Sequence, residues 1–111
     1  MEIGSLSSMQ IQIFSPGIDV PDPLRVYVEK NLQEVLKHFV ERLTRVEVHL
    51  KDVNSSRKNG VDKRCLLEAR PRGLDPVTAE HDAPEFKEAV HQAILKLERA
   101  LQHRIDKHRT H

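Results

Sequence analysis

Catalytic motifs are absent from the sequence. Its 111 residues contain no GxSxG motif, no HExxH motif, no phosphate-binding loop and no glycine-rich dinucleotide turn. The single cysteine, Cys65, falls on the inward side of a predicted strand, which favours a small buried hydrophobic residue over a nucleophile. His49 falls on the outward side of another predicted strand, where an exposed histidine needs no catalytic role. The sequence therefore predicts a protein that is not an enzyme, with no cofactor and no small-molecule substrate.

The histidines raise the question of a metal site. Of seven histidines, His103, His108 and His111 cluster near the C-terminus. His103 and His108 are five residues apart, which places them on different sides of a helix. No cysteine pair or carboxylate-histidine motif accompanies them, so we predict no bound metal.

The compartment is inferred from what the chain lacks. With one cysteine, no intrachain disulfide can form, so an oxidising compartment is not required. The sequence has no apolar run long enough to cross a membrane. Residues 1–8 lack the basic and apolar parts of a signal peptide and are predicted to be a flexible lead-in. We predict a cytoplasmic protein without membrane contact.

Charge is segregated along the chain although its total is near zero. The formal net charge is +1, from 18 basic and 17 acidic residues. Residues 44–72 carry eight basic and four acidic residues, and residues 85–111 carry six basic and four acidic ones, whereas residues 1–22 and 73–84 each sum to -3. In the last segment Lys96, Arg99, His103 and Lys107 follow at steps of three, four and four, which places them on one flank of a helix. Such a row is typical of phosphate-backbone binding, and equally of a solvated helix end where the macrodipole favours cations.

Hydrophobic periodicity predicts the elements that position these residues. Alternating or three- and four-residue apolar spacing predicts strands at 9–14, 45–52, 63–70 and 76–80 and helices from 22 to about 39–41 and from 84 to beyond 105. We expect Asp22 to cap the first helix and Asp82 to open a capping box for the second. The order β-α-β-β-β-α predicts an α+β fold, with a four-stranded mixed sheet and both helices on one face. The first two strands should be parallel, joined by a right-handed crossover, and the other pairs antiparallel.

Aromatic residues are few. Phe14, Phe39 and Phe86 are all predicted to lie in or near the core, which leaves no aromatic platform for stacking single-stranded bases. RNA binding by such a chain would use phosphates, sugar hydroxyls and shape.

The ordered motifs resemble the family of ribosome hibernation-promoting factors and ribosome-associated inhibitors, also called sigma-54 modulation proteins. The resemblance covers about residues 9–108. Its parts are the strand MQIQIF, a helix resembling LRxYVEKxLxxLxKxF from Leu24 to Phe39, the strand Val46 to Leu50, the turn at Gly73, Asp82 before the last helix, and KLERAL from Lys96 to Leu101.

The resemblance implies a non-enzymatic ribosome hibernation factor of bacteria with a fold similar to double-stranded RNA-binding domains. Such factors bind the small (30S) ribosomal subunit and its rRNA in the channel for mRNA and for A-site and P-site tRNA. They inhibit translation under stress or in stationary phase by occupying that space. Family RNA-binding positions fall on Arg25, Lys30, Lys37, Lys96, Arg99, His103 and Lys107.

Three departures from the family pattern qualify this assignment. Phe86 stands where the family has a tyrosine, and His103 replaces a lysine, which makes that charge depend on pH. The chain ends soon after the last helix, so it resembles the short form of the family, with residues 9–108 as one ribosome-binding domain that is monomeric off the ribosome. The alternative is a small regulatory module that binds an acidic protein partner or a structured RNA other than the ribosome.

Overall fold

The computed structural model describes residues 9–53 and 60–109, apart from the side chains of residues 108 and 109. The predicted flexible lead-in at residues 1–8 lies outside the described residues, as does most of the polar loop that follows the second strand. The elements are β1 (Gln10–Phe14), α1 (Asp22–Val35), the 3-10 helix η2 (Lys37–Arg42), β2 (Leu43–Asp52), β3 (Lys63–Pro71), β4 (Val77–Ala83) and α2 (Phe86–Arg109).

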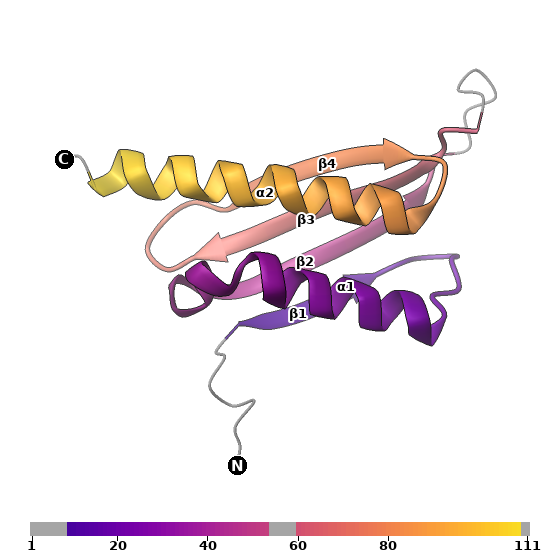
Figure 1. Cartoon of the computed structure of the whole chain (residues 1–111), viewed down its shortest axis with the longest axis horizontal. Helices are drawn as coiled ribbons and strands as arrows, with labels where there is room; N and C mark the ends of the chain where they lie inside the picture. Colours follow the sequence, from indigo (N-terminus) through magenta and orange to yellow (C-terminus); the bar gives the residue numbers. More distant parts are fainter. Residues whose placement is uncertain (1–8, 54–59, 110–111) are drawn as a thin grey trace, which may run out of the picture.

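The four strands form one mixed sheet in the order β1-β2-β3-β4. β1 and β2 are parallel, and the other two pairs are antiparallel. Both helices lie on the same side of the sheet, with α2 along β3 and β4 and α1 on the side of β1 and β2 (Figure 1). The predicted α+β fold is therefore confirmed.

The opposite side of the sheet, which we call the open face, carries no helix among the described elements (Figure 1). It is formed by every second residue of each strand, whose side chain points away from the helices. These residues are Gln10, Gln12 and Phe14 on β1; Arg45, Glu47, His49 and Lys51 on β2; Arg64, Leu66, Glu68 and Arg70 on β3; and Thr78, Glu80 and Asp82 on β4.

The core lies between the sheet and the helices because each element has one apolar side. The inward residues of β2 and β3 alternate with the open-face residues and are buried, as the sequence pattern predicts. The stripes of the two helices meet this surface, with Val28 and Leu32 of α1 and Ile94, Leu97 and Leu101 of α2 fully buried. No polar or charged side chain in the described part of the chain is buried. Burial of apolar surface thus fixes the fold and leaves the charges on the surface.

The first helix differs from the prediction at both ends. Asp22 is its first helical residue rather than its cap, and the capping position is Pro21, whose carbonyl accepts the Arg25 amide at 3.0 Å. Pro21 can begin the helix because its fixed φ of -63° suits the entry. The α-helix ends at Val35, earlier than expected, and tightens into η2. This tighter turn still buries Phe39 and brings the chain into β2.

The predicted capping box of the second helix is wrong. β4 continues to Ala83, past the expected end at residue 80, because it stays paired with β3 as far as Lys63. Asp82 is therefore a strand residue, and its carboxylate binds Arg64 across the sheet instead of capping a helix. α2 begins at Phe86, two residues later than expected.

The prediction that every phenylalanine lies in or near the core is wrong for Phe14. Phe39 is buried and Phe86 half-buried, but Phe14 is 41% exposed. The physical reason is strand parity: because Ile11 and Ile13 face the core, Phe14 must point to the open face.

Candidate nucleic-acid interface

The predicted cationic row of α2 lies on the surface of the helical side. Lys96, Arg99, His103 and Lys107 are all exposed, while the buried stripe of Ile94, Leu97 and Leu101 holds α2 on the sheet. The Lys96 ammonium donates to the carbonyl oxygen of Glu80 at 3.1 Å. The row therefore borders the edge strand β4, with its Lys96 end fixed to the strand backbone.

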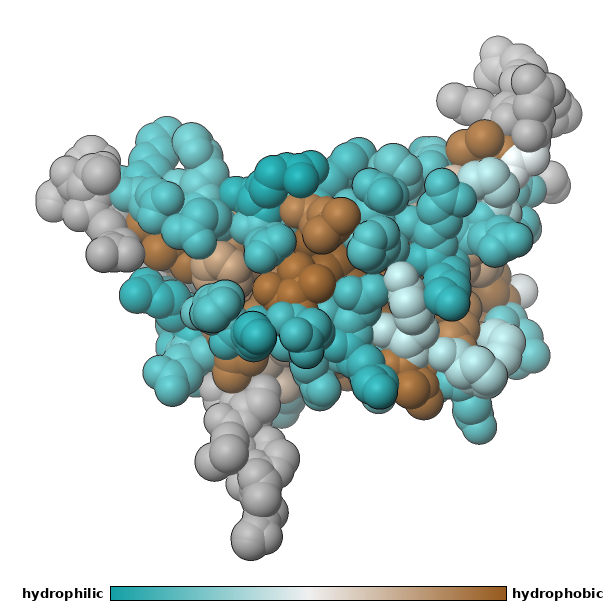
Figure 2. Space-filling model, viewed as in Figure 1, coloured by the Kyte–Doolittle hydropathy of each residue, from teal (hydrophilic) through white to brown (hydrophobic). Residues whose placement is uncertain are grey.

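The cations predicted on the first helix are also exposed but separate from that row: Arg25 and Lys30 lie on α1, whereas Lys37 lies on η2. Arg25 and Lys37 point to solvent, and Lys37 lies 3.6 Å from Glu34 in an exposed ion pair. Lys30 lines a groove of about 520 Å³ together with Tyr27 of α1 and Lys87 of α2. Figure 2, which views the helical side, shows hydrophilic residues over both helices and a hydrophobic strip between them.

The Tyr27–Lys87 contact is a feature that the sequence did not reveal. The Lys87 ammonium lies 5.0 Å from the centre of the Tyr27 ring, within the range of a cation-π interaction. Lys87 is nine residues before Lys96, which is two and a half helical turns, so the two lysines lie on opposite sides of α2. Lys87 therefore lies on the groove side of α2, whereas the row that begins at Lys96 lies on the side next to β4. Helical periodicity could have separated Lys87 from the row, but not placed it over Tyr27.

On the open face, charged residues pair with one another. The Arg64 guanidinium forms a fork with the Asp82 carboxylate, at 2.8 Å from Nε and 3.1 Å from Nη2, and its Nε also lies 2.9 Å from Glu80. Arg45 lies 3.0 Å from Glu47. A hydrogen bond from His49 lowers the pKa of the Glu47 carboxyl, and the nearby Arg45 and Arg70 charges lower it further. The open face as a whole therefore has little net charge, since its four basic residues are matched by four acidic ones, two of them on β4.

One cluster on the open face has ligand types suited to a metal. One possible ligand atom each from Glu47, His49 and Glu68 lies within 4.8 Å of the others. Arg45 contacts Glu47 and Arg70 contacts Glu68, at 3.0 and 3.4 Å. Because the guanidinium groups already neutralise both carboxylates, a cation would have to displace them, and we assign no metal here.

The structure confirms the prediction that Cys65 lies in the core. It is fully buried, and burial raises the pKa of its thiol to about 12. At neutral pH the thiol is protonated and is therefore a poor nucleophile.

A mixed four-stranded sheet with two helices on one face defines a small α+β domain, and exposed cations lie on its helical side. A family model described as sigma 54 modulation protein / S30EA ribosomal protein matches residues 11–109, and the chain belongs to this family. The resemblance drawn from the sequence is thus confirmed. The family is one of ribosome hibernation factors rather than enzymes, which confirms the non-enzymatic prediction as well.

A curated relative is the ribosome hibernation promotion factor of Mycobacterium tuberculosis, 29% identical over 105 residues. The match covers 95% of this chain and 47% of that protein, so the chain spans about half the length of the relative.

Two solved structures share the fold. A ribosomal subunit interface protein from Coxiella burnetii superposes with a TM-score of 0.71 at 18% identity, covering 87% of this chain and 99% of that one. The N-terminal domain of Protein Y from Thermus thermophilus gives a TM-score of 0.64 at 23% identity, covering 81% of this chain and 92% of that one.

Among the described helices, none has the length and apolar character that crossing a membrane requires.

Proposed function

We propose that this protein binds the small (30S) ribosomal subunit in the channel for mRNA and for A-site and P-site tRNA, and inhibits translation by steric occlusion under stress or in stationary phase. Membership of the sigma 54 modulation family and the name of the mycobacterial relative support a ribosomal partner. The observation that carries the choice of surface is the exposed row on α2. In this proposal residues 9–108 are the ribosome-binding unit of a cytoplasmic protein that is monomeric off the ribosome.

The row suits contact with the phosphates of rRNA. From Lys96 to Lys107 it extends eleven residues along α2, or about 16 Å at the helical rise per residue, so it can meet several phosphates. Lys96 keeps donor capacity beyond its hydrogen bond to Glu80, because an ammonium has three protons. Arg25 and Lys30 of α1 and Lys37 of η2 supply further contacts. Because the buried stripe fixes α2 on the sheet, these cations meet RNA as a preformed surface.

Sedimentation of 30S subunits with the purified protein at two salt concentrations tests this proposal. If about four phosphates are neutralised, the logarithm of affinity should fall with the logarithm of salt at a slope of about -3 to -4. The double variant Arg99→Glu/Lys107→Glu should lose most of the affinity for 30S subunits, and the affinity that remains should depend less steeply on salt.

The matched control is Arg42→Glu/Arg72→Glu, which removes the same charge at exposed sites off the row. This control should keep most of the affinity. Equal losses in the two variants would mean that bulk charge, not the α2 row, drives binding. If wild-type protein fails to sediment with 30S subunits, the proposed partner is wrong. In-vitro translation with the same variants then tests inhibition.

A further inference from the structure

An aromatic stack lies on the open face between the edge strand β1 and its neighbour β2. The Phe14 ring of β1 lies 4.9 Å from the His49 ring of β2, measured between centroids, with 15° between the ring planes. The two residues are direct neighbours in the parallel register of β1 and β2. Leu66 of β3 continues the row beyond His49. Phe14 is one of two large hydrophobic side chains exposed in the described residues, so its ring presents an apolar face to solvent.

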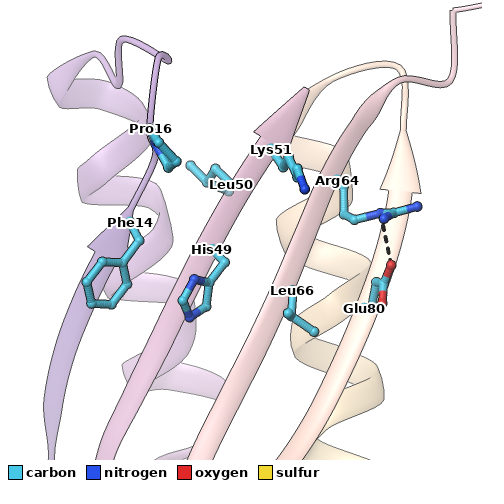
Figure 3. Close-up of a pocket in the computed structure, with 8 residues that line it drawn as sticks. All are labelled: Phe14, Pro16, His49, Leu50, Lys51, Arg64, Leu66 and Glu80. Carbon is cyan, nitrogen blue, oxygen red and sulfur yellow. Dashed lines mark ion pairs between the residues drawn. The ribbon is translucent and has the colours of Figure 1, made fainter. Parts of the chain in front are cut away.

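The stack borders a hollow with polar groups on its far side (Figure 3). This hollow has a volume of about 320 Å³, within the range of small-molecule sites. Figure 3 shows Lys51 beyond His49 on the same strand, and Arg64 paired with Glu80 on the side of β4. Arg64 is also held by Asp82, whereas Lys51 is exposed and has no ion-pair partner among the described residues. Lys51 is therefore the cation available to a ligand.

We propose that the open face binds one unpaired nucleotide of RNA, with its base extending the Phe14–His49 stack and its phosphate on Lys51. This inference deepens the proposed function, since it gives the domain a second RNA contact on the side opposite to the α2 row. It also revises the expectation that RNA binding would use only phosphates, sugar hydroxyls and shape.

The chemistry of the hollow favours a nucleotide over a peptide segment. Phenylalanine and histidine rings are the types on which unpaired bases stack, and the outer ring face of the Phe14–His49 stack offers one such surface. Arg64 lies against one carboxylate oxygen of Glu80, so the other can accept a hydrogen bond from a base amino group or a ribose hydroxyl. Lys51 adds the positive charge that a phosphate requires. Aromatic, acceptor and cation thus lie together within one hollow.

Fluorescence anisotropy with a short single-stranded oligoadenylate RNA tests the proposal, with an abasic ribose-phosphate strand of equal length as the comparison. Wild-type protein should bind the oligoadenylate roughly 5- to 100-fold more tightly than the abasic strand, the range expected for stacking of one base. Phe14→Ala should abolish this difference without weakening binding of the abasic strand. Lys51→Ala should weaken binding of both strands.

The control is Val26→Ala, which shortens the other exposed large hydrophobic residue, on α1 rather than on the open face. It should leave both affinities unchanged. Thermal unfolding of each variant checks that the fold is retained. NMR titration with adenosine monophosphate gives a second measurement, in which the amide signals of Phe14, His49 and Leu66 should shift.

Equal affinity of wild-type protein for the two strands, or equal losses in Phe14→Ala and Val26→Ala, would overturn the nucleotide site. If Phe14→Ala weakens 30S binding but not oligoadenylate binding, the open face contacts a ribosomal protein and the inference is wrong. The proposed function is tested separately, because 30S sedimentation and in-vitro translation of the wild-type protein decide it whatever the oligonucleotide result.

Discussion

The helical side and the open face of this domain carry similar residue types in opposite arrangements. On the helical side, the row from Lys96 to Lys107 projects from α2, and the Lys96 contact in the structure is to a backbone carbonyl rather than to an acid. On the open face, Arg45, Arg64 and Arg70 each lie within 3.4 Å of a carboxylate. The helical side is thus arranged to meet an external anion, whereas the arginines of the open face hold neighbouring strands and side chains in place.

This contrast explains how a chain of net charge +1 can belong to a ribosome-associated family. The excess of basic residues in the central strands is largely offset by pairing within the sheet. Along the α2 row the cations remain exposed to solvent. Net charge governs long-range attraction, but the arrangement of charges decides which surface contacts a phosphate.

The largest effect is expected from a change beneath both surfaces. Leu67 of β3 is fully buried between the sheet and the helices, so Leu67→Ala should lower the free energy of unfolding by about 2–5 kcal/mol. Because the core positions both faces, this variant should weaken RNA binding at the α2 row and at the open face once it begins to unfold. Chemical denaturation measures the loss. A stability change below about 1 kcal/mol would show that the two faces do not depend on a common core.

A smaller effect is expected from the ion pair at β4. Asp82→Asn removes the charge that holds the Arg64 fork, and an exposed pair of good geometry contributes up to about 1 kcal/mol. The same denaturation measurement should show this loss, while 30S binding falls far less than in the Arg99→Glu/Lys107→Glu variant because Asp82 lies off the α2 row. Glu34→Gln is the control, since its pair with Lys37 is longer, at 3.6 Å, and more exposed. If Asp82→Asn weakens 30S binding as much as Arg99→Glu/Lys107→Glu does, the division between the faces is wrong.

The sequence predicted the features that depend on periodicity and missed those that depend on pairing between elements. Alternation along β2 identified the buried residues Val46, Val48 and Leu50, and the spacing in α2 identified its core stripe and its exposed row. The prediction for Asp82 is wrong because an Asp followed three residues later by a Glu also has the spacing of a capping box. Only the continued pairing of β4 with β3 decides that Asp82 binds Arg64 instead.

Phe14 shows a different limit. Its residue type favours the core, but successive side chains of a strand point to opposite faces of the sheet. Because Ile11 and Ile13 face the core, this alternation places Phe14 on the open face. The Phe14–His49 stack also required the register of β1 and β2, because the residues are far apart in sequence. Tyr27 and Lys87 meet for a comparable reason, since their contact depends on the placement of two helices.

The smallest effect, a pH dependence at Glu47, tests whether pairing on the open face stabilises the fold. The pKa of Glu47 is lowered in the folded state from an ordinary value of 4.5, first by the hydrogen bond from His49 and then by Arg45 and Arg70. A lowered folded-state pKa contributes stability above the unfolded pKa, and this contribution is lost as pH falls through the folded pKa. Glu47→Gln should therefore melt below wild type at about pH 7, and the gap should narrow as the pH falls below the ordinary pKa of 4.5. Glu34→Gln, whose carboxylate faces solvent on α1, should show a smaller gap. A gap for Glu47→Gln that stays constant over this range would mean that its charge does not stabilise the sheet, and the contrast between the two faces would then rest on geometry alone.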